Sequence, residues 1–367
     1  MRARDLGIVI GDLPAGPLNA ITDVAGVRVG HTTLISGDGP LVVGKGPIRT
    51  GVTVILPHQG DPGGEPVFAG SHTLNGNGEM TGLEWVRESG MLTTPIGLTN
   101  THSVGVVRDA LVAGSVAARE GVVRWSLPVV AETWDGYLND VDGQHVRPEH
   151  VFAALRAAAG GPVAEGSVGG GTGMKAFGFK AGIGTASRRV AAEQGGYTVG
   201  VLVQANHGRR SRLRVDGVPV GPEIPHAQVP GPDVPAPTAG SIIAVVATDA
   251  PLLPQQCRRL AQRAELGVAR GGGGGENDSG DIFLAFATGN RGLHREDDTK
   301  APLTFPVQML NEDHIDELFW ATIEATEEAI LNSMVAAETM TGRDGITFHA
   351  LPHDRLVELM RRYGRLA

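Results

Sequence analysis

The sequence is poor in cysteine, tyrosine and long apolar runs. Its one cysteine, Cys257, excludes an intramolecular disulfide, a site built from several thiolates and a CxxC redox motif. A net charge of −9 without a basic cluster argues against nucleic acid or an anionic membrane as a partner. The N-terminal apolar stretch, Leu6–Ile10, is too short for a signal-peptide core or a membrane span. We therefore expect a cytoplasmic protein.

Glycine and apolar residues are abundant instead. The chain has 54 glycines in 367 residues, about twice the usual share of roughly 7%. Tight turns and close backbone approaches should therefore be common. The 41% hydrophobic content is enough for a large core, which predicts one large domain over residues 1–367 or two closely joined ones.

Short apolar runs rich in Val, Ile and Phe alternate with helical patterns. This alternation predicts an α/β layered fold with helices outside packed sheets. The predicted strands are Val52–Leu56, Leu127–Ala131, Lys175–Phe179, Thr198–Val203, Ser241–Ala247 and Asp281–Ala287. The predicted helices cover Val107–Arg119, a segment from Pro148, one from Pro251 to Val268, Ile315–Met340 and Asp354–Tyr363.

The segment Pro219–Gly240 breaks this pattern. It holds many prolines and has no periodicity, which predicts an exposed loop or linker. At Ser241 the sequence changes at once to a buried strand. A linker entering a core strand explains this junction, and so does a cleavage site between Gly240 and Ser241.

A serine at such a junction can attack the preceding carbonyl carbon. An N-to-O acyl shift followed by hydrolysis would leave Ser241 with both a hydroxyl nucleophile and a free α-amino group. The unperturbed pKa of that amine, about 7.7–8.0, suits a general base near neutral pH. Gly240 helps because glycine tolerates backbone geometries closed to other residues.

Two further polar groups lie at strand ends. Asn206 follows the predicted strand Thr198–Val203, where a side-chain amide can stabilise an oxyanion or simply form a turn. Ser279 and Asp281 follow five glycines and fall on the same side of an extended chain. They could relay hydrogen bonds to a nucleophile or cap a strand.

Aromatic and acidic residues follow another predicted strand. Glu132, Asp135 and the neighbouring Trp134 could bind a substrate ammonium by charge and cation–π contact, or form a solvated turn. His102 and His207 are interpreted as hydrogen-bonded structural residues. The sequence lacks a zinc motif, and Gly169–Gly173 lacks the lysine of a phosphate-binding loop, so we expect neither a catalytic metal nor a bound nucleotide.

Taken together, these stretches resemble the DmpA family of self-processing L-aminopeptidase/D-esterases and β-peptidyl aminopeptidases. The resemblance covers nearly the whole chain and rests on many colinear motifs. They include Asn19–Val24, Ser71–Gly82, Asn100–His102, Glu132–Gly136, Gly169–Met174, Gly184–Ser187, Val203–Gly208, Gly240–Ile243, Ala247–Asp249, Asn277–Phe283 and Tyr363–Leu366.

The resemblance implies a four-layer α-β-β-α sandwich of the DmpA/ornithine acetyltransferase type. It implies cleavage into an α chain (1–240) and a β chain (241–367), assembled as a homotetramer of αβ units without a cofactor. The family nucleophile falls on Ser241, the oxyanion amide on Asn206, and the supporting serine and acid on Ser279 and Asp281. The implied substrates are short peptides and aminoacyl amides or esters.

One position departs from the family. Trp134 stands where a tyrosine is implicated at the active site, and an indole can donate one hydrogen bond but cannot accept one. Tyr137 lies three residues further on and is not a positional match. This departure leaves open a non-catalytic peptide-binding protein. The likeness to self-processing N-acetyltransferases leaves open acyl transfer to an amine acceptor on the same fold, although those relatives typically use a threonine nucleophile.

Overall fold

The computed structural model describes residues 1–117, 125–231, 240–294 and 301–366. Two large sheets form its centre. The six-stranded sheet has the order β4 (Met91–Leu92), β3 (Val67–Gly76), β12 (Gly280–Ala287), β11 (Ser241–Thr248), β10 (Thr198–Asn206) and β9 (Ile183–Arg189). The four-stranded sheet has the order β1 (Arg28–Ser36), β2 (Ile48–Leu56), β5 (Ile96–Asn100) and β6 (Val129–Thr133).

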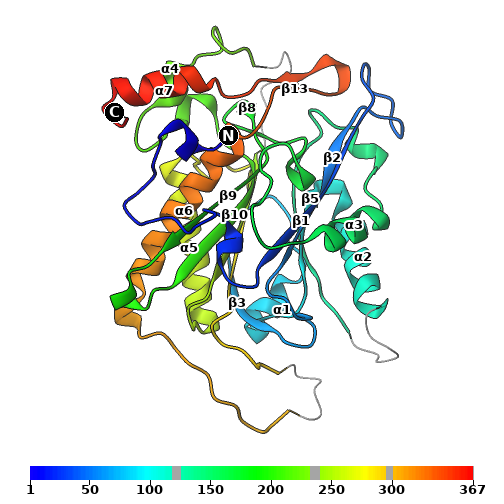
Figure 1. The fold of residues 1–367 in the computed structure, drawn as a ribbon. Coiled ribbons are helices and arrows are strands. Elements are labelled where there is room, and N and C mark those ends of the chain that lie inside the picture. The colour runs from blue at the N-terminus through cyan, green and yellow to red at the C-terminus, as the bar shows by residue number, and fades with distance from the viewer. Residues whose placement is uncertain (118–124, 232–239, 295–300, 367) are drawn as a thin grey trace.

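Helices cover the outer face of each sheet (Figure 1). Helices α5 (Pro254–Arg270) and α6 (Asp316–Val335) pack on the six-stranded sheet. Helices α2 (Val104–Ala117) and α3 (Pro148–Ala157) pack on the four-stranded sheet. The two inner faces meet in a buried cluster that includes Ile55, Ile96, Leu98, Ile243, Val245 and Leu284. The expected four-layer α-β-β-α sandwich is therefore confirmed.

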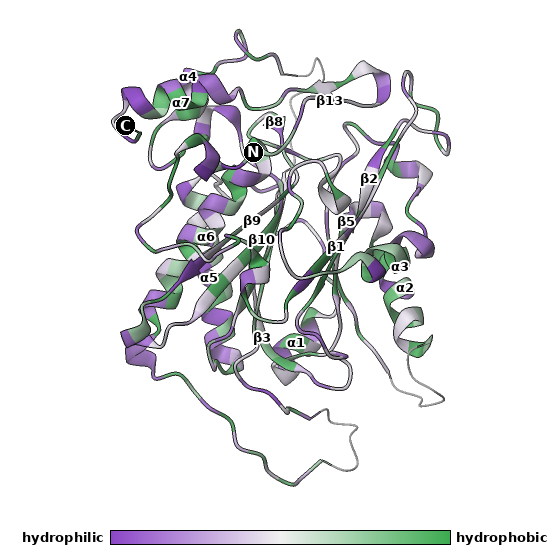
Figure 2. Cartoon of the chain, in the orientation of Figure 1, coloured by the Kyte–Doolittle hydropathy of each residue, from purple (hydrophilic) through white to green (hydrophobic). Residues whose placement is uncertain are grey.

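Strand β11 shows why apolar runs without alternation form the centre of such a sandwich. Ile243 and Val245 face the second sheet, whereas Ile242, Ala244 and Val246 face the helical layer, and all five are fully buried. A strand covered on both faces needs apolar residues at every position. Figure 2 shows hydrophobic colours along the central strands, whereas the outer helices carry both hydrophobic and hydrophilic colours.

The remaining elements are short. They are α1 (Leu83–Ser89), α4 (Val220–Glu223), α7 (His353–Arg362), β7 (Lys175–Ala176), β8 (Phe179–Lys180), β13 (Met340–Thr341) and β14 (Thr347–Phe348). Helix α7 confirms the predicted C-terminal helix. Cys257 is buried in α5.

Several predicted boundaries were wrong. The predicted strand Lys175–Phe179 is a tight hairpin, because Phe177 and Gly178 adopt positive φ values of 51° and 74°. The predicted loop Pro219–Gly240 begins with helix α4, whose Val220 is buried. Residues 232–239 of this loop lie outside the described residues. The same holds for Arg119, the last residue of the first predicted helix. The long helix α6 ends at Val335 rather than Met340.

Among the strands of the two large sheets, β1, β3, β5, β9 and the two-residue β4 were not predicted, and neither were the short strands β13 and β14. Their sequences mix polar side chains into the apolar pattern, as in Ser71-His72-Thr73 of β3 and Ser187-Arg188 of β9. Arg188 is fully buried and pairs with Glu324 and Glu328 of α6 at 3.1 and 2.7 Å. A buried charge needs such partners, and they fix α6 against β9. No helix in the described part of the chain is long and apolar enough to cross a bilayer.

Backbone contact between β9 and α6 depends on a glycine. A Cβ atom at Gly184 would lie 1.9 Å from the carbonyl oxygen of Ala329. We expect Gly184→Ala to lower the free energy of unfolding by about 1–3 kcal/mol or more, because the helix must move away from the sheet. Gly105→Ala is the matched control, since a Cβ at this position in α2 meets no atom within 4 Å.

Thermal unfolding of the two variants checks this prediction. We expect a lower midpoint for Gly184→Ala and an unchanged or slightly higher one for Gly105→Ala, because alanine reduces the conformational freedom of the unfolded chain. Equal midpoints for Gly184→Ala and the unmodified chain would contradict the described contact.

Candidate active site

Three strands place Ser241 at one end of the six-stranded sheet. Ser241 is the first residue of β11, opposite Asn206 in antiparallel β10 and opposite Gly280 in parallel β12. It is 6% exposed and lines a pocket of ≈ 270 Å³. The candidate nucleophile is therefore held by pairing on both sides while its side chain borders open space.

The peptide bond before Ser241 has a defined environment. The backbone N–H of Gly280 donates a hydrogen bond to the carbonyl oxygen of Gly240, with an N···O distance of 3.1 Å. A Cβ atom at Gly240 would lie 2.8 Å from the Cα atom of His207. The close approach explains why a residue without a side chain stands here.

Ser279 and Asp281 lie beside Ser241, at the start of β12. The Ser279 hydroxyl donates to Oδ1 of Asp281 at 2.6 Å, and the backbone N–H of Ile242 also donates to this carboxylate. Burial raises the pKa of Asp281 to about 6, and the hydrogen bond from Ser279 opposes the rise. The predicted pairing of these two side chains on one side of the chain is present.

The Asn206 side chain is oriented by two main-chain groups. Its Nδ2 donates to the carbonyl oxygen of Trp134 at 2.9 Å, and its Oδ1 accepts from the backbone N–H of Lys175 at 3.1 Å. An amide nitrogen carries two hydrogens, so one remains for another acceptor. Asn206 is 1% exposed, which makes this orientation rigid.

Glu132 forms the acidic wall of the pocket. Its carboxylate accepts from the backbone N–H of Glu79 at 3.0 Å and from the Thr101 hydroxyl. Burial raises the pKa of Glu132 above its ordinary value. Glu79, Trp134 and Asp278 also line this pocket.

The three residues predicted to bind substrate separate in space. Glu132 and Trp134 line the pocket, and the Trp134 indole meets the His102 ring edge-on at 5.6 Å. Asp135 does not line it: this side chain is fully buried, accepts from the Asn139 amide at 3.1 Å, and has a pKa raised to about 6 by burial. Successive residues of an extended segment point to opposite sides, and here Trp134 takes the open one.

The two histidines have different surroundings. His102 pairs with Asp142 at 3.2 Å, in agreement with a structural role. The expectation of hydrogen bonds for His207 was wrong, since neither ring nitrogen has a hydrogen-bond partner among the described residues. Its ring packs edge-on against Phe177 at 5.0 Å, and burial lowers its pKa to about 3. The neutral His207 ring therefore behaves as an apolar side chain beneath Gly240.

Metal ligands do not gather in the part of the chain that the structure describes. No group of three His, Cys, Asp or Glu side chains there has the geometry to hold a metal ion. The pocket itself is lined by the Ser241 hydroxyl and the carboxylates of Glu79, Glu132 and Asp278, whereas Asn206 and the Ser279–Asp281 pair lie beside Ser241 on the neighbouring strands and do not line it.

The model of peptidase family S58 matches residues 19–348. This chain belongs to peptidase family S58. The predicted membership in the DmpA family is thus confirmed. Because the match spans both sheets and ends at β14, the whole sandwich is the family's fold rather than an addition to it.

Curated and solved relatives agree with this assignment to family S58. The β-peptidyl aminopeptidase BapA of Sphingosinicella microcystinivorans is 51% identical, covering 100% of this chain and 93% of the relative. The structure of a Burkholderia sp. β-aminopeptidase has a TM-score of 0.93 and 57% identity, covering 99% of each chain. The L-aminopeptidase D-Ala-esterase/amidase of Ochrobactrum anthropi, a variant of the Ntn hydrolase fold, has a TM-score of 0.89 and 44% identity over 100% and 99% of the two chains.

Four site residues were not named from the sequence. Thr101 and Glu79 hold Glu132, Asp278 lines the pocket, and Gly280 donates to the Gly240 carbonyl. Asp278 and Gly280 belong to the polar cluster that contains Ser279, so adjacency was the available signal for them. Thr101 follows β5, a strand that was not predicted.

The hydrogen bond between Ser279 and Asp281 predicts a response to mutation. We expect Ser279→Ala to raise the pKa of Asp281 further above 6, because this bond stabilises the ionised carboxylate. Carbon-13 NMR titration of labelled aspartate carboxyls checks it, and Asp281→Asn identifies the signal by its loss. An unchanged or lower pKa in Ser279→Ala would contradict the described geometry.

Proposed function

We propose that this chain cleaves itself between Gly240 and Ser241 and then acts as an aminopeptidase or amidase with Ser241 as an N-terminal nucleophile. The observation that carries the proposal is the hydrogen bond from the Gly280 N–H to the carbonyl oxygen directly before Ser241. The names of the relatives, β-peptidyl aminopeptidase and L-aminopeptidase D-Ala-esterase/amidase, support the same activity.

Self-cleavage begins with attack of the Ser241 hydroxyl oxygen on the Gly240 carbonyl carbon. Negative charge develops on the carbonyl oxygen, which already accepts a hydrogen bond from Gly280. Collapse breaks the C–N bond, the nitrogen takes up the hydroxyl proton, and an ester forms. Water then hydrolyses the ester, leaving the Gly240 carboxylate and the free amine of Ser241.

Substrate cleavage repeats this chemistry on a second carbonyl. The Ser241 amine accepts the hydroxyl proton as the oxygen attacks, and the free N–H of Asn206 stabilises the oxyanion. The leaving amine takes the proton, and water releases the amino acid from the acyl-enzyme. Ser279 and Asp281, which are hydrogen-bonded to each other beside Ser241, are assigned the role of orienting the nucleophile.

The substrate's own ammonium group is assigned to Glu132. Its carboxylate lies in the same pocket as Ser241 and is fixed by Thr101 and the Glu79 backbone. The Trp134 ring provides an apolar wall and a cation–π surface. Asp135 receives no contact with substrate in this proposal, because its carboxylate is enclosed behind the pocket. Assembly into a homotetramer remains a prediction from family resemblance.

The processing step has a direct test. We expect the unmodified chain to yield fragments 1–240 and 241–367 under denaturing mass spectrometry, and Ser241→Ala to remain one species of 38.2 kDa. Alanine has no oxygen to attack the carbonyl, whereas Ser241→Thr keeps a hydroxyl and should process at a reduced rate. Ser126→Ala, a serine outside this pocket, is the matched control. Persistence of the intact chain in the unmodified protein would refute self-cleavage.

Glu132→Gln tests the ammonium-binding role. We expect processing to continue, because that step involves no substrate ammonium, while kcat/KM for an aminoacyl nitroanilide falls by about tenfold or more, since charge-assisted hydrogen bonds contribute about 1.5–3 kcal/mol. The unmodified enzyme should have a lower kcat/KM for an N-acetylated substrate than for the same substrate with a free amine. In Glu132→Gln this difference in kcat/KM should disappear. Equal kcat/KM in the variant and the unmodified enzyme would remove Glu132 from substrate binding.

A further inference from the structure

Strand β3 leaves one backbone edge without a partner. Its neighbour β4 pairs only with Val67 and Phe68, and Ala69 donates its N–H to Gly90 on the same side. Because backbone groups alternate along a strand, the N–H and C=O groups of Ser71 and Thr73 point toward this same edge. No strand in the described part of the chain covers them.

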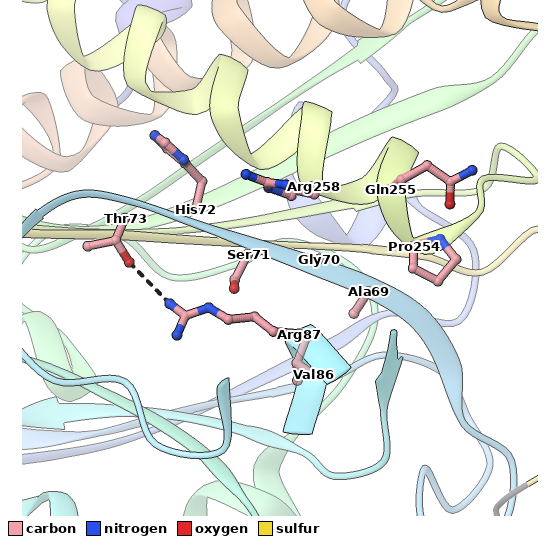
Figure 3. Close-up of a pocket in the computed structure, with 10 residues that line it drawn as sticks. All are labelled: Ala69, Gly70, Ser71, His72, Thr73, Val86, Arg87, Pro254, Gln255 and Arg258. Atoms are coloured by element: carbon pink, nitrogen blue, oxygen red, sulfur yellow. Dashed lines mark hydrogen bonds between the residues drawn. The ribbon is translucent and has the colours of Figure 1, made fainter. Parts of the chain in front are cut away.

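This open edge is the floor of a pocket of ≈ 590 Å³ (Figure 3). Val86 and Arg87 of α1 form one wall, and Pro254 and Arg258 of α5 form the other. The Ser71 side chain is 6% exposed, and its hydroxyl has no hydrogen-bond partner among the described residues. A buried polar group without a partner is costly, so a ligand that supplies one is favoured at this place.

The pocket is connected to the candidate active site through a third one. A pocket of ≈ 510 Å³ shares Thr73 and Arg87 with the pocket of Figure 3. It shares Gly78 and Glu79 with the pocket of Ser241. The three adjoining pockets, from Ser241 to Ser71, are here called the β3 groove. Ser71 lies seven residues before Gly78, a path of at most about 23 Å in an extended chain.

Charge changes sign along the β3 groove. The end at Ser241 is lined by the carboxylates of Glu79, Glu132 and Asp278, and among the described residues no lysine, arginine or histidine lines it. The far end carries Arg87 and Arg258. A peptide has the complementary polarity, with an ammonium at its N-terminus and a carboxylate at its C-terminus.

Acidic groups near the far end do not neutralise it. Arg87 pairs with Glu84, but the Glu84 side chain is 92% exposed and such surface pairs are weak. His72 pairs with Glu265 at 2.7 Å, so the Glu265 carboxylate already has a partner other than the two arginines. Arg258 has no ion-pair partner among the described residues, so both arginines can contact an incoming anion.

We propose that the leaving-group half of a peptide substrate binds in the β3 groove as an added antiparallel strand, with its C-terminal carboxylate held by Arg87 and Arg258. Backbone hydrogen bonds to the edge of β3 give affinity without selecting side chains. Peptides of about six to eight residues match the extended length of the groove. This inference rests on the proposed aminopeptidase activity and specifies its substrate class.

The test compares a heptapeptide with a free C-terminal carboxylate and the same peptide with a C-terminal amide. We expect the processed enzyme to favour the acid by about two- to fivefold in kcat/KM at low salt, the size typical of exposed charge pairs. Screening by salt should reduce this ratio. In the Arg87→Ala/Arg258→Ala double variant the ratio should fall to about one.

Charge reversal gives a positive signal. For Arg87→Glu/Arg258→Glu we expect a higher kcat/KM for the heptapeptide amide than for the heptapeptide acid. A heptapeptide amide that ends in lysine should have a higher kcat/KM than either of them. Arg108→Ala, an exposed arginine on α2 that lines none of the three pockets, is the control and should retain the unmodified acid-to-amide ratio. All variants are compared by this ratio, which a general loss of folded enzyme does not change.

Two failures can be told apart with an aminoacyl nitroanilide. If the unmodified enzyme hydrolyses the nitroanilide but gives an acid-to-amide ratio of one, or if the double variant retains the ratio, the carboxylate site is overturned while the proposed function stands. If the processed enzyme hydrolyses neither nitroanilide nor peptide, the proposed function fails, and the inference about the β3 groove fails with it.

Discussion

The parallel pairing of β11 with β12 is the constraint on which the site depends. Two parallel strands start at the same edge of a sheet, and a crossover must join them. Helix α5 provides this crossover, so Ser241 and Gly280 become neighbours although 38 residues lie between them. The same pairing brings Ser279 and Asp281 beside the first residue of β11 and allows the Gly280 N–H to reach the Gly240 carbonyl.

Antiparallel β10 completes this arrangement from the other side. It ends where β11 begins, which sets Asn206 opposite Ser241. Every candidate group for acyl chemistry therefore comes from a strand terminus rather than from a long loop. Such positions are more rigid than loop positions, which suits a reaction that needs an aligned attack geometry.

The sequence allowed prediction of the parts of the site that adjoin purely apolar strands. The runs before Asn206 and after Ser241 and Asp281 are unmistakable, so the polar residues at their ends could be recognised. Glu79 and Thr101 could not be found this way, because β3 and β5 mix polar residues with apolar ones. Whether Asp135 lines the pocket depends on which side of the extended segment faces the pocket, and residue spacing alone does not reveal that side. Loop turns such as Phe177–Gly178 are likewise set by φ values that tertiary contacts impose.

Because of the hydrogen bond between Asn206 and the main-chain carbonyl of Trp134, the orientation of the Asn206 amide is independent of the side chain that lines the pocket at position 134. Because Asn206 is held by a backbone atom, the identity of the side chain at position 134 does not enter its orientation. Other side chains at position 134 can thus reshape the pocket without displacing the Asn206 amide. For protein engineering, position 134 is a place that saturation libraries can diversify while the candidate groups around Ser241 are left in place.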